Sequence, residues 1–312
     1  MTLAFVFPGQ GSQYVGMGRD LYEQYEEARA VFDQADQVLG FSLTDMCFNG
    51  SGEDLSQTIN TQPAVLTVSV ACLAVWNKLG GPKPTAVAGH SLGEYSALVA
   101  AGSLAFADAV SLVRNRGRYM QEAVPVGEGG MAALMGLSGE AAQELCQKAA
   151  ASGVVEAVNL NSPGQVVIAG DNNGLQAAAV LAKEAKAKYI PLSVSAPFHS
   201  SMMRPAGARL GADLESINLA DPTIPVIANV TADYANSGAE IKELLIKQVY
   251  SPVRWEETVV RLIESGVDTV VEIGPGKVLS GLVKKINRKI KITNIEVPAS
   301  YEKALALVGE VS

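Results

Sequence analysis

Apolar and polar residues alternate along the first part of the chain in the pattern of an α/β protein. Residues 3–7 are apolar and end at a Pro-Gly pair, which predicts a short buried strand. Between residues 21 and 39 apolar side chains recur in steps of three and four, which predicts one amphipathic helix that ends at Gly40. Residues 64–79 predict a more buried helix. A brief strand at 85–88 then leads through a glycine-bounded turn into an alanine-rich helix.

The middle of the chain has a different order of elements. Its pattern predicts strand, helix, strand, strand, helix and strand at residues 131–137, 140–151, 154–160, 166–169, 175–187 and 189–194. This βαββαβ order is that of a ferredoxin-like unit. We therefore expect a small domain at residues 127–195, inserted into a larger α/β domain formed by residues 1–126 and 196–312. After it we expect a strand at 269–273 and a final helix at 278–287.

Composition excludes several classes of protein. Of the 312 residues, 48% are hydrophobic and 18% are charged, so the chain is not a disordered polymer. A net charge of −8 argues against a general nucleic-acid binder. The three cysteines lie far apart, which fits the reducing cytoplasm. No basic segment precedes the apolar start, and Thr and Ser interrupt the longest apolar stretch, so we expect neither a signal peptide nor a membrane span.

Residues 89–93, Gly-His-Ser-Leu-Gly, match the G-x-S-x-G pattern between a predicted strand and a predicted helix. Such a turn holds the serine oxygen away from the backbone, and the helix N-terminus offers N–H groups to an oxyanion. The alternative interpretation is a simple turn bounded by glycines. The strand and helix on either side favour Ser91 as a nucleophile in an α/β-hydrolase-like large domain.

A serine nucleophile needs a base, and the chain has only two histidines, His90 and His199. His90 adjoins Ser91, so we expect its side chain to point away from the serine. His199 follows the small domain, and loops at a domain junction favour a cleft. A lone histidine is more often structural, but here His199 is the better candidate for the base. Two histidines also exclude a zinc site built on several of them, and we expect no metal.

Arg116 stands out on the predicted helix at residues 109–120. At about 100° per residue it falls in the middle of an apolar face. A buried guanidinium is costly unless an anion meets it. It therefore either pairs with an internal carboxylate or binds a carboxylate of the substrate.

Two further glycine loops follow predicted strands. Residues 7–13, Phe-Pro-Gly-Gln-Gly-Ser-Gln, lack the G-x-G-x-x-G of a dinucleotide site but form a turn that offers the backbone N–H of Gln10. Residues 274–277 lack the spacing of a nucleotide phosphate loop, and we interpret them as a structural turn.

Taken together, these motifs resemble those of the malonyl-CoA:acyl-carrier-protein transacylases. The inserted ferredoxin-like unit agrees with the small subdomain of that family. The matching segments keep the family's order and span nearly the whole chain: residues 7–13, 89–95, 116–117, 161–165 (Asn-Ser-Pro-Gly-Gln) and 198–200 (Phe-His-Ser).

The resemblance implies a ping-pong acyl transfer in fatty-acid biosynthesis. Ser91 would attack malonyl-CoA with His199 as base, and the phosphopantetheine thiol of acyl carrier protein would then take the malonyl group from the serine ester. The backbone N–H groups of Gln10 and Leu92 would form the oxyanion hole, and Arg116 would grip the free malonyl carboxylate. No bound cofactor is implied, because coenzyme A enters as the substrate thioester.

The resemblance also implies that a main-chain carbonyl, at Gln248 in this chain, orients the histidine in place of an acid. Phe198 resembles the form that prefers malonyl over larger α-branched groups. An acidic carrier protein needs a basic patch to dock, although such a patch is usually only a solvated surface. Two clusters are candidates: Lys284, Lys285, Arg288, Lys289 and Lys291, and separately Lys183, Lys186 and Lys188.

Three alternatives stay open. A serine hydrolase such as a thioesterase shares Ser91 and His199 but has no need of Arg116. A trans-acting malonyltransferase of a polyketide synthase would use identical chemistry, so the sequence does not separate the two pathways. A non-catalytic scaffold subunit would form no acyl-enzyme, and it has no use for an arginine on an apolar face.

Overall fold

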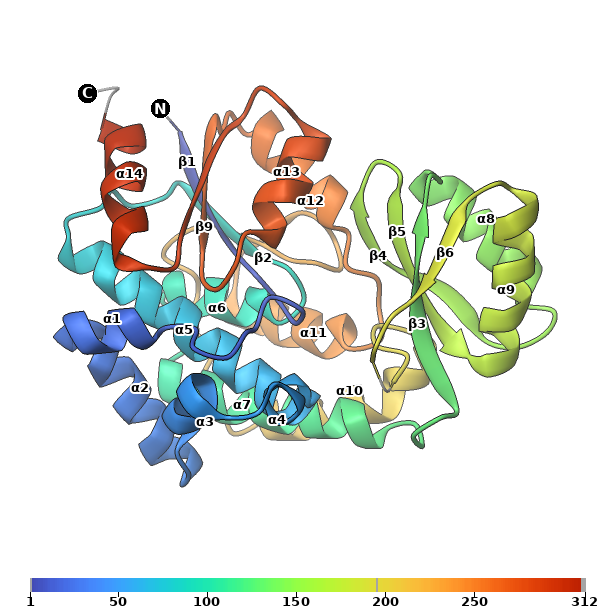
Figure 1. Cartoon of the computed structure of the whole chain (residues 1–312), viewed down its shortest axis with the longest axis horizontal. Coiled ribbons are helices and arrows are strands. Elements are labelled where there is room, and N and C mark those ends of the chain that lie inside the picture. Colours follow the sequence, from blue (N-terminus) through green and yellow to red (C-terminus); the bar gives the residue numbers. More distant parts are fainter. Residues whose placement is uncertain (1, 195, 310–312) are drawn as a thin grey trace.

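Two sheets organise the computed structural model, which describes residues 2–194 and 196–309. Figure 1 shows a large lobe that contains both ends of the chain and a smaller lobe beside it. The sheet of the large lobe has the strand order β10-β9-β1-β2-β7-β8. All of its strand pairs are parallel except β7 with β8. The strands are β1 (Leu3–Phe7), β2 (Ala86–Gly89), β7 (Val226–Ile227), β8 (Tyr234–Ala235), β9 (Thr269–Ile273) and β10 (Lys291–Ile295).

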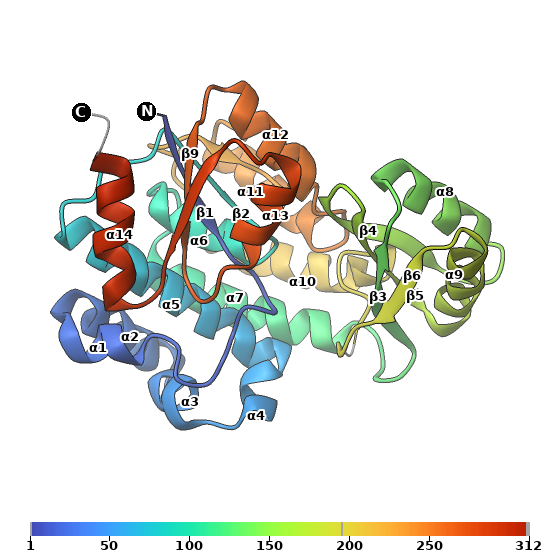
Figure 2. The same cartoon turned by 45° about the horizontal axis from the view of Figure 1, so that its top comes forward.

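Helices cover both faces of this sheet (Figure 2), which explains why β1 is apolar at every position. Leu3, Phe5 and Phe7 point into the core that contains α5, α7 and the first two helices, whereas Ala4 and Val6 pack with α12 and α13. The helices of this lobe are α1 (Arg19–Gln24), α2 (Glu26–Leu39), α3 (Leu43–Asn49), α4 (Gly52–Ser56), α5 (Thr58–Lys78), α6 (Gly93–Ala100), α7 (Phe106–Glu122), α10 (Arg204–Leu214), α11 (Gly238–Gln248), α12 (Trp255–Glu264), α13 (Val278–Ile286) and α14 (Pro298–Gly309). A single 3₁₀ turn, Ser201–Met203, precedes α10.

The smaller sheet confirms the expected ferredoxin-like unit. Its strands β3 (Gly129–Met135), β4 (Val155–Ser162), β5 (Gln165–Asp171) and β6 (Lys188–Pro191) form an antiparallel sheet in the order β4-β5-β3-β6. Helices α8 (Gly139–Ala149) and α9 (Asn172–Glu184) complete the βαββαβ order. The domain limits at 126/127 and 195/196 stay predictions, and residue 195 lies outside the described residues.

The two faces of the small sheet have different partners. Leu134 and Ile168 pack under α8 and α9 in a core of their own, while Met131 and Val167 belong to the core of the large lobe. The main chain of Val253 also hydrogen-bonds to β4, with Val253 N to Val158 O at 2.8 Å and Leu160 N to Val253 O at 3.0 Å. The small lobe is thus fixed to the large one along one edge of its sheet.

Two predictions about helices were wrong. The single helix expected at 21–39 is two helices, because Tyr25 is extended, with φ −127° and ψ 124°. Glu26 and Glu27 follow in the first turn of α2, where carboxylates favour a helix start. The helix expected at 278–287 is not the last, since β10 and α14 follow it.

Helix α5 begins at Thr58, earlier than the apolar pattern predicts. Its first turns are polar, yet Thr61 and Gln62 are buried. By length and composition α5 is the one helix among the described residues that is apolar enough to cross a membrane, but 89% of that stretch is buried inside the protein. It occupies the position of a core helix.

Candidate active site

The parallel pairing of β1 with β2 brings two glycine turns to one edge of the large sheet. Phe7 pairs with Gly89, so the turns that follow the two strands lie side by side. His90 N donates a hydrogen bond to Phe7 O at 3.0 Å. A Cβ atom on Gly9 would lie 2.4 Å from His90 O, so only glycine permits this close approach.

Ser91 occupies the tight turn between β2 and α6. Its φ of +51° lies in the left-handed region, which is unfavourable for a residue with a side chain. A Cβ on Gly89 would lie 1.9 Å from the carbonyl carbon of Gly93, and one on Gly93 would lie 2.0 Å from Phe7 O. The two glycines of the motif are therefore required by backbone packing.

His199 lies against Ser91, although 108 positions separate them along the chain. The Nε2 atom of His199 is 2.7 Å from Ser91 Oγ, and its Nδ1 atom is 2.8 Å from the carbonyl oxygen of Gln248. Because a carbonyl only accepts, Nδ1 carries the proton and Nε2 turns its lone pair toward Ser91. His199 is only 4% exposed. Burial, and next the charge of Arg116, lower its pKa to about 3.

Arg116 reaches the same serine from α7. It is 1% exposed, and its Nη2 atom lies 3.3 Å from Ser91 Oγ. Its Nη1 donates to Gln62 Oε1 at 2.8 Å and its Nη2 to Gln248 Oε1 at 2.9 Å. Between residues 2 and 309, residue 195 apart, no carboxylate forms an ion pair with Arg116. Two neutral amides thus orient the guanidinium and leave its charge without a direct counter-ion, and burial lowers its pKa.

Three buried polar residues of the site were missed by the sequence analysis. Glu94 Oε2 accepts from Asn229 N at 3.0 Å and from Gln248 Nε2 at 2.9 Å, and burial raises the pKa of Glu94 to about 7. Gln62 lies in the polar first turns of α5, so no apolar face around it marked it as a buried residue. Asn229 lies two residues after β7, a two-residue strand that is too short to be recognised by pattern.

The two backbone N–H groups predicted for an oxyanion hole flank Ser91. Leu92 immediately precedes α6, and Gln10 lies in the neighbouring glycine turn; both residues line the same cleft as the serine. Within the described chain neither N–H donates to a protein acceptor. The side chain of Gln10 is held by Thr58, with Nε2 donating to Oγ1 at 3.2 Å.

The cleft has a volume of about 220 Å³ and lies between the two lobes. Its walls include Met131 and Val167 of the small sheet, and Phe198 and Leu282 of the large lobe. We expected the side chain of His90 to point away from Ser91; in the structure its Nε2 lies 2.8 Å from Asn161 Oδ1 of the small lobe. In the part of the chain that the structure describes, no three His, Cys, Asp or Glu side chains are grouped as metal ligands would be.

One of the two basic clusters adjoins this cleft. Helix α13 lines it through Val278, Leu279 and Leu282, and Lys285 on the same helix donates to Gln165 Oε1 of the small lobe at 2.8 Å. Gln165 itself lines the cleft. The side chains of the other cluster lie at the end of α9 and the start of β6 and are exposed.

Comparison with known proteins agrees with this geometry. The model of the acyl transferase domain family matches residues 4–309. The malonyl CoA-acyl carrier protein transacylase of Bacillus subtilis is 52% identical over 310 residues, which is 99% of this chain and 98% of that protein. Its counterpart in Escherichia coli K12 is 46% identical over 305 residues, 97% and 99% of the two chains.

Solved structures of malonyltransferases are also similar to this chain. The acyl-carrier-protein S-malonyltransferase of Burkholderia pseudomallei superposes with a TM-score of 0.96 at 47% identity, over 98% of this chain and 100% of that one. A malonyl-transacylase solved in complex with a type II polyketide synthase acyl-carrier protein has a TM-score of 0.96 and 44% identity, over 98% and 100%. The chain therefore belongs to the acyl transferase family and, within it, to the malonyl CoA-acyl carrier protein transacylases.

Proposed function

We propose that this protein moves malonyl from malonyl-CoA, through a malonyl ester of Ser91, to the phosphopantetheine thiol of acyl carrier protein in fatty-acid biosynthesis. The observation that carries the proposal is that the side chains of His199 and Arg116 both reach the hydroxyl oxygen of Ser91. His199 Nε2 lies 2.7 Å and Arg116 Nη2 3.3 Å from Ser91 Oγ. The names of the relatives support malonyl-CoA as donor and acyl carrier protein as acceptor.

In the first half-reaction, Ser91 Oγ attacks the thioester carbonyl carbon while its proton passes to His199 Nε2. The backbone N–H groups of Gln10 and Leu92 stabilise the oxyanion. The carbon–sulfur bond then breaks, and coenzyme A leaves as a thiol with the proton that His199 held. The Gln248 carbonyl keeps the imidazole in the required tautomer throughout.

In the second half-reaction, the carrier thiol attacks the serine ester and gives its proton to His199. Ser91 recovers a proton as it leaves. Arg116 binds the free carboxylate during both halves. Only one methylene separates that carboxylate from the reacting carbonyl, so its counter-ion must stand beside the nucleophile, as Arg116 does.

The remaining assignments follow from composition and burial. We place the protein in the cytoplasm, since Cys47, Cys72 and Cys146 are free and buried. We propose no nucleic-acid or membrane partner, and no resident metal or cofactor, because coenzyme A enters as substrate. A trans-acting role with a polyketide synthase is the second candidate, favoured by the structural neighbour bound to such a carrier protein.

Intact-protein mass spectrometry after mixing with malonyl-CoA tests the proposal. We expect one malonyl adduct, located on Ser91 by peptide mapping, that disappears when acyl carrier protein is added. An adduct that decays in buffer alone would indicate a hydrolase instead. Folded protein that gains no adduct would overturn the assignment of Ser91 and favour a scaffold subunit.

A further inference from the structure

The main-chain polar groups of the turn that holds Ser91 are almost completely paired. His90 O accepts from Gly93 N at 2.9 Å. Ser91 O accepts from Glu94 N at 3.1 Å and from the side-chain Nε2 of Gln248 at 3.0 Å. Besides the N–H of Leu92, which we assign to the oxyanion hole, the Gly89 carbonyl and the Ser91 N–H have no partner in the turn itself. Buried backbone groups need partners, so these two call for an explanation.

One side chain binds both of them. Asn229 Nδ2 donates to Gly89 O at 2.6 Å, and Asn229 Oδ1 accepts from Ser91 N at 2.7 Å. The side-chain amide of Asn229 thus makes one donated and one accepted hydrogen bond with the backbone of the turn, as the backbone of a neighbouring strand would. Asn229 has 0% exposure, so bulk water does not reach it as a substitute partner.

We propose that Asn229 is a positioning residue that fixes the orientation of Ser91 for acylation. This inference rests on the proposed role of Ser91 as nucleophile. The left-handed φ of Ser91 is strained for a residue with a side chain, so the surrounding contacts must hold it in place. Without the amide, the peptide between His90 and Ser91 is free to rotate toward a relaxed conformation. That rotation moves both Ser91 Oγ and the adjoining N–H of Leu92.

Asn229 is itself fixed in place. Its backbone N–H donates to Glu94 Oε2 at 3.0 Å, and its carbonyl accepts from Arg254 N at 3.1 Å. Glu94 stands on α6, the helix that Ser91 precedes. The backbone of Asn229 is therefore tied to the helix that follows the turn and to the start of α12.

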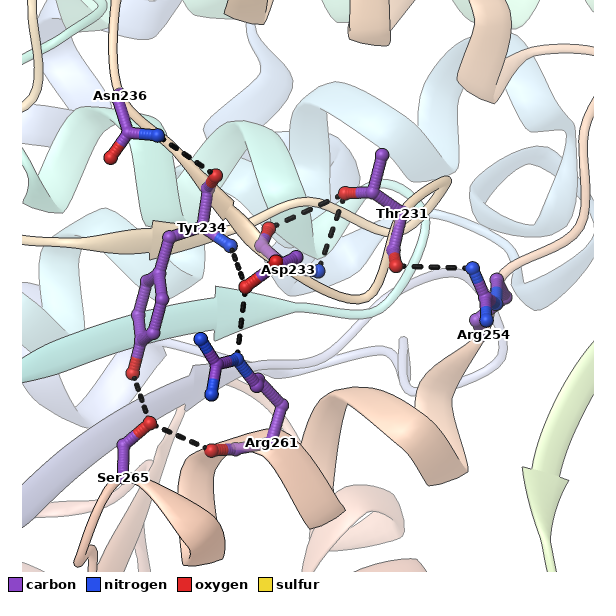
Figure 3. Close-up of polar contacts among 7 residues, drawn as sticks. All are labelled: Thr231, Asp233, Tyr234, Asn236, Arg254, Arg261 and Ser265. Atoms are coloured by element: carbon purple, nitrogen blue, oxygen red, sulfur yellow. Dashed lines mark hydrogen bonds and ion pairs between the residues drawn. The ribbon is translucent and has the colours of Figure 1, made fainter.

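The segment that carries Asn229 is also anchored on its far side, as Figure 3 shows. Arg254 Nη1 donates to Thr231 O at 3.1 Å, and Arg261 Nε donates to Asp233 Oδ1 at 2.9 Å. Tyr234 Oη donates to Ser265 Oγ at 2.9 Å. These contacts tie the segment to α12, so the amide reaches the turn from a fixed support rather than from a free loop.

The test is the rate of Ser91 acylation per active site in Asn229→Ala, with Asn236→Ala as matched control. Asn236 lies on the same segment but is exposed to solvent, and its side chain donates only to Tyr234 O at 3.3 Å. Rapid mixing with malonyl-CoA gives the rate, and the burst of released coenzyme A counts the active sites. We expect Asn229→Ala to lose about 100-fold in rate, the cost of a displacement of about 1 Å, with KM changed less than about 3-fold. Asn236→Ala keeps the wild-type rate.

Asn229→Asp supplies a second readout, the pH dependence of the acylation rate, which would not change if Asn229 only supported the fold. As a carboxylic acid, Asp donates to Gly89 O and accepts from Ser91 N; as a carboxylate it has no proton to donate. Its rate relative to wild type therefore rises, about 10-fold or more, as pH falls from 8 to 5.5. The charged or titratable groups around residue 229 are Glu94, Arg116 and His199. They are present in both proteins, so the ratio of the two rates reports the titration of residue 229. If Asn229→Ala does not fold, Asn229→Asp at low pH retains both bonds and carries the test.

A serine-directed fluorophosphonate is the second probe, because it forms an O–P bond to an activated serine as fluoride leaves, whatever the natural substrate. Wild type that takes this label but no malonyl contradicts the proposed function alone. Asn229→Ala that reacts with either probe within about 2-fold of wild type overturns the role of Asn229 alone. A ratio of Asn229→Asp to wild type that does not change with pH overturns it as well.

Discussion

The carbonyl oxygen of Gln248 lies 2.8 Å from Nδ1 of His199, where a carboxylate stands in a Ser-His-Asp triad. A carbonyl fixes the tautomer of the imidazole but brings no negative charge to stabilise an imidazolium. Burial and the charge of Arg116 disfavour the imidazolium further, which explains why the pKa of His199 falls to about 3. The imidazolium formed during the attack is therefore a strong acid, which readily returns its proton to the departing sulfur.

The first prediction concerns the pH dependence of acylation. A lowered pKa means that His199 stays neutral, and so competent as a base, above about pH 3. We expect the single-turnover acylation rate to show no inflexion near 6.5, the pKa of an ordinary histidine, and to fall only at the acid end of the range in which the protein stays folded. Stopped-flow rates from pH 4 to 8, with circular dichroism at each pH, measure this.

Glu94 is the control for that profile, since burial raises its pKa to about 7. An inflexion near 7 that disappears in Glu94→Gln belongs to Glu94. One near 6.5 that persists in this variant contradicts the assignment to His199.

The second prediction concerns Arg116 and the choice of acyl group. Arg116→Ala removes the charge that meets the malonyl carboxylate, and hydrogen bonds to charged groups are worth about 1.5–3 kcal/mol. We expect kcat/KM for malonyl-CoA to fall about 10- to 150-fold, while that for acetyl-CoA falls much less. Steady-state kinetics with both thioesters measure the ratio. An equal loss for the two substrates would mean that Arg116 only supports the fold.

The third prediction concerns the backbone packing of the serine turn. A Cβ on Gly93 would lie 2.0 Å from Phe7 O, a main-chain atom of a buried strand that cannot move aside. We expect Gly93→Ala to destabilise the protein by about 3 kcal/mol and to lower acylation per active site. Gly52→Ala is the matched control. No atom lies within 4 Å of the position that the new Cβ would take, and residue 52 begins α4. We therefore expect the stability of this variant to equal that of the wild type or to rise slightly. Equal urea midpoints for the two variants would contradict the prediction.

The fourth prediction concerns docking of the acidic carrier protein. Lys285 and Lys289 lie on or just after α13, which lines the cleft. Reversing both charges is expected to raise the KM for carrier protein about 10-fold and to spare transfer to a small thiol such as N-acetylcysteamine. Reversal of Lys183 and Lys188 tests the other cluster in the same assay. Unchanged carrier kinetics in both double variants would rule out docking at either.

Local rules explain why much of the fold was predictable. The continuous apolar run of β1 indicates a strand buried on both faces, and the βαββαβ order indicates the ferredoxin-like unit. The same rules failed where local signals conflict with packing. The polar start of α5 gives no apolar period, yet its Gln62 is buried because Arg116 needs an acceptor there. The extended Tyr25 divides a helix whose apolar spacing is unbroken.

By itself, the sequence determined which residue types are available for the chemistry. It contains two histidines, one G-x-S-x-G turn and one arginine in the middle of an apolar face, and these motifs resemble one family in the family's order. Chemistry of this kind depends on side-chain type, which is local. The tertiary structure alone decided which neutral groups hold these residues. Gln62, Gln248 and Asn229 come from separate parts of the chain, and long-range packing brings them to the site. The side-chain amides of Gln62 and Asn229 bind Arg116 and Ser91, and the main-chain carbonyl of Gln248 binds His199. No local period along the chain records a partner more than 50 residues away, as Gln62 is from Arg116 at a separation of 54.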